Sequence, residues 1–225
     1  MVGISSINPS RPLLLILSAF FLALFTGCAT SRSPGAPKHQ VQNVFRKDPV
    51  LPVNVRRVAV LPMSYREATA SLVAGKRALD PVFRTELAKA SRFETIFIEP
   101  SQLKQWTGKE AWDAYEDLPG KLFIELWEKT GAEAVLFVHL SEYKAYPPMA
   151  IGWRMKLVKY DMDILWAVEE MFDAAEEGVS NAAQQYEKDQ ERSNPVLEDS
   201  RSILLSPTRF GHYTLKAVLE TLPAR

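Results

Sequence analysis

Pairs of neighbouring carboxylates are the most numerous candidates for chemistry in this sequence of 225 residues. Three of these pairs are Asp161 with Asp163, Glu169 with Glu170, and Glu176 with Glu177. Two carboxylates that converge in a pocket can cleave a glycosidic bond or bind a divalent metal ion. Asp161 and Asp163, however, lie within the segment YDMD between two predicted strands, where Asp side chains typically stabilise a turn. We therefore expect these carboxylates in turns or in solvent.

The other candidates are two histidines and one thiol. His139 alternates with Val135 and Phe137 in a predicted strand, which favours a partly buried, hydrogen-bonded histidine over a base or a metal ligand. His212, which follows Gly211 in a predicted helix, is interpreted in the same way. Phosphate-binding, dinucleotide-binding and nucleophile-elbow motifs do not occur. We therefore expect a protein that is not an enzyme, with no metal, no cofactor and no identified small-molecule substrate.

The amino terminus carries the most specific signal. Residues 13–25 (LLLILSAFFLALF) form an uncharged run that is shorter than the roughly 20 residues a membrane-spanning helix requires. Arg11 is the only charged side chain before this run. A positive start followed by a short apolar run is typical of a signal peptide, which we assign to residues 1–27.

The signal peptide ends in Leu-Phe-Thr-Gly-Cys, residues 24–28, which resembles the bacterial lipobox with Phe25 in place of the usual Leu. The resemblance implies cleavage between Gly27 and Cys28 and a covalent lipid on the Cys28 sulfur. Cys28 is the only cysteine, so it has no internal disulfide partner. Ala29 stands where many lipoproteins retained at the inner membrane have Asp. By resemblance to that sorting rule we expect an outer-membrane lipoprotein that faces the periplasm.

Residues 28–52 are rich in proline and polar residues, and we expect them to form a flexible tether. Residues 53–225 are sufficient for one domain with a sizeable core. Loss of residues 1–27 removes only Arg11, which leaves 26 basic and 27 acidic side chains. Nucleic-acid binding normally requires a basic surface, so we exclude it as a function.

The hydrophobic pattern predicts an α/β (α+β) domain, in which helices pack on a mixed sheet of about five strands. Residues 151, 153, 155 and 157 share an apolar face, while Arg154 and Lys156 lie on the wet face of the same antiparallel strand. The expected strands are 57–63, 93–98, 134–143, 150–160 and 164–172, and the expected helices begin at Asp80-Pro81, Ser101, Pro119 and Ser206-Pro207.

The order of RRVAVLPM, SRFETIFIEPSQL and TGAEAVLFVHLSEY, followed by a strand pair, resembles a known bacterial domain. It is shared by the amino-terminal region of TolB, the curli-secretion lipoprotein and the lipoprotein activator of penicillin-binding proteins, and by uncharacterised lipoproteins. The resemblance covers residues 54–222. It implies a non-enzymatic protein-binding or assembly factor in the periplasm, with envelope proteins or other copies of itself as partners.

The alternative is a subunit of an oligomeric outer-membrane export apparatus like that of curli secretion. No pair of long hairpins with alternating lipid-facing residues occurs, which argues against pore formation but leaves ring assembly open.

Two segments are candidate partner surfaces. Tyr143 and Tyr146 lie beside Pro147-Pro148 at a predicted hairpin tip, and tyrosine is frequent in binding hot spots. The polar segment 176–199 is the second candidate.

Overall fold

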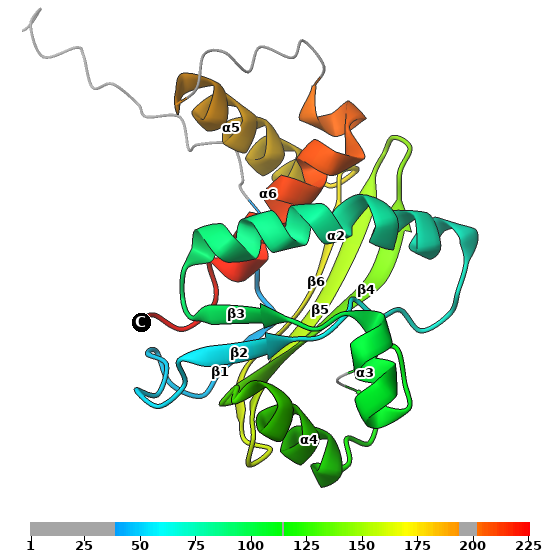
Figure 1. Cartoon of the computed structure of the whole chain (residues 1–225). Helices are drawn as coiled ribbons and strands as arrows, with labels where there is room; N and C mark the ends of the chain where they lie inside the picture. Colours follow the sequence, from blue (N-terminus) through cyan, green and yellow to red (C-terminus); the bar gives the residue numbers. More distant parts are fainter. Residues whose placement is uncertain (1–38, 114, 194–201) are drawn as a thin grey trace, which may run out of the picture. The chain divides into compact units, whose positions relative to one another are not determined.

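A computed structural model describes residues 39–113, 115–193 and 202–225. Its centre is a six-stranded mixed sheet with the order β1-β6-β5-β4-β2-β3 (Figure 1). Strands β2, β3 and β4 are parallel, and β4, β5, β6 and β1 are antiparallel to their neighbours. The strands are β1 (Val44–Arg46), β2 (Arg57–Val60), β3 (Glu94–Phe97), β4 (Ala134–Lys144), β5 (Ala150–Lys159) and β6 (Ile164–Asp173). The predicted α/β class is confirmed, with one strand more than expected.

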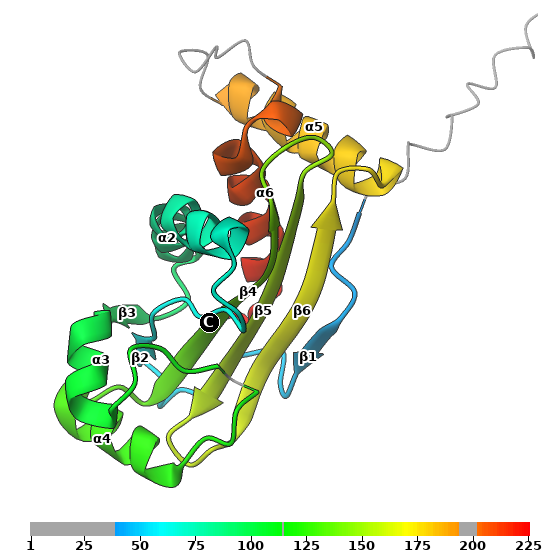
Figure 2. The ribbon, with the colours of Figure 1, turned by 90° about the vertical axis from the view of Figure 1, so that its right-hand side faces the viewer.

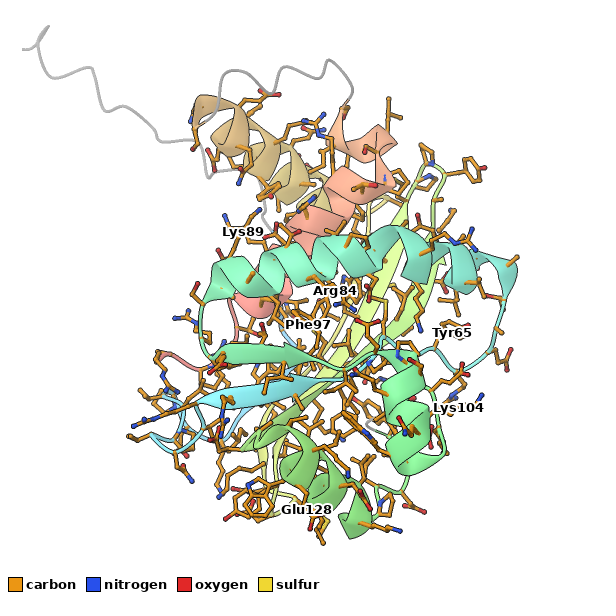
Figure 3. All side chains as sticks on the ribbon, viewed as in Figure 1. Tyr65, Arg84, Lys89, Phe97, Lys104 and Glu128 are labelled. Carbon is orange, nitrogen blue, oxygen red and sulfur yellow. The ribbon has the colours of Figure 1, made fainter. Side chains whose placement is uncertain are left out.

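Helices cover both faces of the sheet unequally (Figures 1 and 2). One face packs on α2 (Ala70–Ala90) and α6 (Pro207–Leu219), with α5 (Glu177–Ser193) beside them. On the other face, α3 (Pro100–Thr107) and α4 (Gly120–Thr130) cover only the part of the sheet near β2 and β4. At the edge of the first layer, Arg84 of α2 lies over the ring of Phe97 in β3, 4.5 Å from its centroid (Figure 3).

The alternation predicted for β5 places its side chains as expected. Ile151, Trp153 and Leu157 are buried in the core under α2 and α6. Arg154 and Lys156 point to the other face and are only partly buried. The pleat of the strand thus separates the large core from the half-covered face of the sheet.

Two helix ends follow their sequence signals. α4 ends at Gly131, whose φ of 64° lies in the left-handed region that glycine adopts without strain. α6 begins after Ser206, whose Oγ accepts a hydrogen bond from the backbone N–H of Arg209.

The start of α2 differs from the prediction. The helix begins after Thr69, whose side chain accepts a hydrogen bond from Leu72, and Pro81 lies in its interior. The first turns of α2 pack closely on β4, since a Cβ added to Gly75 would lie 2.5 Å from Cγ of Tyr143. Pro81 looked like a helix start because proline is favoured there, but tertiary contacts extend the helix upstream of it.

The predicted tether of residues 28–52, and the domain start at residue 53, also differ from the structure. Residues 44–46 form the edge strand β1, and Leu51 is buried in the core. Upstream of β1, the Glu170 carboxylate accepts hydrogen bonds from the backbone N–H groups of Gln42 and Asn43 and lies 3.1 Å from Nε2 of His39. These contacts fix the chain to the sheet from residue 39 onward.

Candidate functional site

Three charged or titratable side chains form a row across the half-covered face of the sheet. His139 of β4 pairs with Arg154 of β5, which pairs with Glu169 of β6. Arg154 also forms an ion pair with Glu169. We call His139, Arg154 and Glu169 the polar row. Its members come from three adjacent strands, so the sheet register alone positions them.

Tyr115, in the segment between α3 and α4, lies over Arg154 and Glu169 of the polar row. The ring of Tyr115 lies under two cations, with Cζ of Arg154 4.0 Å and Nζ of Lys156 4.6 Å from its centroid. The Tyr115 hydroxyl lies 3.5 Å from Glu169 Oε2. Burial raises the pKa of Tyr115, and the bond to Glu169 raises the pKa of Arg154, so Tyr115 stays neutral and Arg154 stays charged at pH 7.

His139 has the residue types of a hydrolytic triad around it but not the geometry. Ser64 Oγ lies 3.0 Å and Asp113 Oδ2 lies 3.2 Å from the same atom, His139 Nδ1. In a Ser-His-Asp triad the serine bonds one imidazole nitrogen and the aspartate bonds the other, so that the ring can pass a proton on. The Ser64 hydroxyl also donates to the carbonyl of Val138. Ser64 and Asp113 therefore both hold Nδ1 of the His139 ring in place. With both groups on one nitrogen, the imidazole does not activate the serine.

The buried imidazole makes stability depend on pH. Burial lowers the pKa of His139, although the Asp113 carboxylate opposes this shift. Below the unfolded-state pKa of about 6.5 the unfolded chain binds the proton more readily, so the folded state loses stability as the pH falls. We expect the free energy of unfolding in urea to fall between pH 7.5 and pH 5.5, and to fall less in a His139→Asn variant. Equal losses in both proteins would contradict this assignment.

A cavity of about 430 Å³ lies next to Ser64 and Asp113. It opens beyond the carboxyl end of β2 and is also lined by Tyr65 (Figure 3), Arg66, Lys76 and Glu110. Burial lowers the pKa of Lys76. Cations and carboxylates line it together, so its charge does not select one class of ligand. Among the described residues, no group of three or more His, Cys, Asp or Glu side chains could hold a metal ion.

Beyond the polar row the sheet face is uncovered. Figure 2 shows the middle of β5 and β6 with no helix in front of it. Apolar side chains lie on the exposed sides of β1 and β6: Phe45 is 51% and Met171 is 45% exposed, Ala167 pairs with Phe45, and Ile164 lies nearer the β5–β6 turn. Glu169 lies on the same side of β6, between Ala167 and Met171. We call the four apolar residues the open sheet face. A solvent-facing side of an antiparallel sheet is normally polar, which makes this composition unusual.

The predicted partner tyrosines have different environments. Tyr143 is buried against α2 at Gly75, because it lies on the core side of β4. Tyr146 is 81% exposed in the turn between β4 and β5. The exposed pair expected from the sequence is therefore reduced to Tyr146.

The carboxylate pairs do not converge. Asp161 accepts a hydrogen bond from the N–H of Asp163 in the β5–β6 turn, as expected for a turn residue. Glu169 and Glu170 point to opposite faces of β6. Glu176 and Glu177 are exposed at the start of α5. Of the second candidate surface, the segment 176–199, the structure describes residues 176–193.

Of the remaining predicted sites, the structure describes His212 but not Gly27 and Cys28. His212 has a partner, because its Nδ1 lies 2.7 Å from the buried carboxylate of Glu86. Gly27 and Cys28 lie outside the described residues. Across the part of the chain that is described, no helix has the length and apolar character needed to cross a membrane.

No protein-family model matches the sequence, and no curated protein matches it. Several solved structures resemble part of the fold. Lipoprotein GNA1162 from Neisseria meningitidis is 14% identical, with a TM-score of 0.40 over 64% of this chain and 99% of that one. The PelC dodecamer from Paraburkholderia phytofirmans is 10% identical, with a TM-score of 0.39 over 81% of this chain and 96% of that one. The LpoB C-terminal domain from Salmonella enterica is 19% identical, with a TM-score of 0.34 over 53% of this chain and 83% of that one. These partial likenesses concern the fold alone.

Proposed function

We propose that this chain is an envelope lipoprotein, anchored through a lipid on Cys28, that binds another protein through the open sheet face and catalyses no reaction. The sequence supports lipid attachment at Cys28, because the apolar run 13–25 leads directly into the lipobox-like residues 24–28. Ala29 supports an outer-membrane location that faces the periplasm. Two or more acyl chains at one cysteine would hold the protein stably on a membrane.

The open sheet face is the single observation that carries the binding role. Phe45 and Met171 expose about half of their side chains on neighbouring strands, and Ile164 and Ala167 extend the apolar area. Glu169, in its ion pair with Arg154, lies within this area between Ala167 and Met171. A surface that combines exposed apolar side chains with a paired charge has a composition found in protein-binding surfaces.

We propose that the protein is not an enzyme because of the geometry of the polar row. Ser64 and Asp113 share one nitrogen of His139, so the imidazole is not placed to take a proton from the serine and pass it on. Tyr115 and Glu169 fix Arg154 between an aromatic ring and a carboxylate. These contacts give the row a structural role beside the binding surface.

Charge substitutions on the open sheet face test the binding role. We expect Phe45→Glu and Met171→Glu each to weaken partner binding by at least about 2 kcal/mol, a factor of about 30, because an unpaired carboxylate would be buried in the complex. The partner is identified by chemical crosslinking in cells that express the wild-type protein, and its affinity is then measured with purified proteins.

Ile124→Glu is the matched control, because Ile124 is also an exposed apolar side chain but lies on the outer side of α4. We expect this variant to bind as the wild type does, and all three variants to keep the wild-type melting temperature. Loss of binding in Ile124→Glu as well, or unchanged binding in the two sheet variants, would contradict the proposed surface.

A further inference from the structure

The turn between β4 and β5 is a strongly exposed apolar feature of the described residues. Residues 145–150 read Ala-Tyr-Pro-Pro-Met-Ala and contain no charged side chain. Tyr146 is 81% exposed, and Pro147 and Pro148 beside it are exposed as well. A tyrosine ring with an apolar body and a polar hydroxyl is suited to the boundary between lipid headgroups and acyl chains.

Contacts within the structure place this turn beside the point where the anchor segment joins the domain. The backbone N–H of His39 donates to the carbonyl of Gly178, and the His39 ring packs on Phe172 with centroids 5.0 Å apart. Two residues after Phe172, the N–H of Ala174 donates to the carbonyl of Met149 in the turn. Figures 1 and 2 both place the β4–β5 turn and α5 at the same end of the sheet.

The length of chain before His39 limits how far this end can stand from a membrane. Eleven positions separate Cys28 from His39. Even a fully extended chain of that length spans at most about 40 Å. This is no more than the diameter of the domain itself, whose radius of gyration is expected to be about 16 Å.

We infer that the Tyr146 turn rests on the lipid surface that holds the anchor, so that this end of the sheet faces the bilayer. The inference rests on the proposed lipid at Cys28. Acidic side chains dominate the neighbouring helix α5, which contains four carboxylates and two basic residues between Glu177 and Ser193. Contact with lipid therefore depends on the apolar turn and not on attraction to anionic headgroups. The open sheet face then stands roughly perpendicular to the membrane, where a partner can reach it.

The test uses the full-length lipidated protein in vesicles of phosphatidylethanolamine and phosphatidylglycerol. Because the lipid blocks the Cys28 sulfur, a Tyr146→Cys variant carries a single reactive thiol for a fluorescent label. Tyr160→Cys is the matched control, since Tyr160 is a half-exposed tyrosine in the β5–β6 turn at the other end of β5. The ten residues of β5 separate the two positions by roughly 33 Å. The measurement is quenching of the label by a nitroxide attached to the lipid acyl chain.

We expect severalfold stronger quenching at position 146 than at position 160, with little change at high salt, because the turn carries no charge. Equal quenching at both positions in protein whose mass includes the lipid overturns this inference and leaves the proposed anchor intact. A mass without lipid overturns both. A photo-crosslinker at position 146 in cells should give lipid adducts, and protein adducts instead of them would assign the turn to a protein partner and overturn the inference.

Discussion

Replacement of Cys28 by Ser is expected to abolish lipid attachment and to leave the protein as an uncleaved precursor. The serine hydroxyl cannot form the thioether that the lipobox resemblance implies, and the cleavage predicted at Cys28 should fail with it. In cells supplied with an alkyne-labelled fatty acid, the wild type should be labelled and Cys28→Ser should not. The precursor should also be heavier by the mass of residues 1–27 than the processed polypeptide.

Ser33→Ala is a suitable control, because it changes a hydroxyl residue five positions after Cys28 without touching the predicted cleavage site. It should be labelled and processed as the wild type is. Normal labelling and processing of Cys28→Ser would refute the anchor.

The largest effect on stability is expected from Trp153→Ala. Trp153 is fully buried in β5, and its Nε1 donates a hydrogen bond of 3.0 Å to Oγ1 of Thr214 in α6. Its removal leaves a large cavity and takes one partner from the Thr214 hydroxyl, which keeps its bond to the Gly211 carbonyl, so we expect a loss of about 3–5 kcal/mol in the free energy of unfolding. A domain of this size should then melt roughly 10 °C lower. Urea unfolding and calorimetry measure the two quantities.

Trp127→Ala provides the matched control. Trp127 is half-exposed on α4, so its replacement should change the free energy of unfolding by no more than about 0.5 kcal/mol. Similar losses in the two variants would show that Trp153 is not the core residue described here.

The sequence predicts those parts of the fold in which local signals agree with tertiary packing. Alternation identifies the buried side of β5, and Gly131 and Ser206 mark helix ends where the structure has them. α2 is different, because Pro81 is a strong local signal for a helix start while Gly75 packs closely on β4. Contacts that distant parts of the chain provide decide where this helix begins.

Strand β1 could not be predicted for a related reason. It has three residues in a segment rich in proline and polar side chains, and its partner β6 lies more than a hundred positions along the chain. Glu170 holds the residues before β1 through backbone N–H groups, which leave no pattern in the sequence. The fixed segment consequently begins earlier, and the part of the chain available as a tether is shorter than the composition suggests.

The candidate site could be predicted only in outline. The sequence indicates a partly buried, hydrogen-bonded histidine at position 139. In the structure His139 is buried, and its Nδ1 lies 3.0 Å from Ser64 Oγ. The sequence does not indicate the partners: Ser64 lies 75 positions away, and Asp113 comes from an irregular segment. The partner surface predicted at Tyr143 is wrong, because the register of β4 shifts between Leu140 and Glu142 and this irregularity places Tyr143 on the core side of the strand.

Photo-crosslinking from the open sheet face in living cells tests the central claim most directly. A photoreactive amino acid at Phe45 should capture one discrete envelope protein, and the adduct should disappear when Met171→Glu is added. The same amino acid at Ile124 should capture none. Absence of an adduct at position 45, or the same adduct at both positions, would contradict a binding role for this face of the sheet.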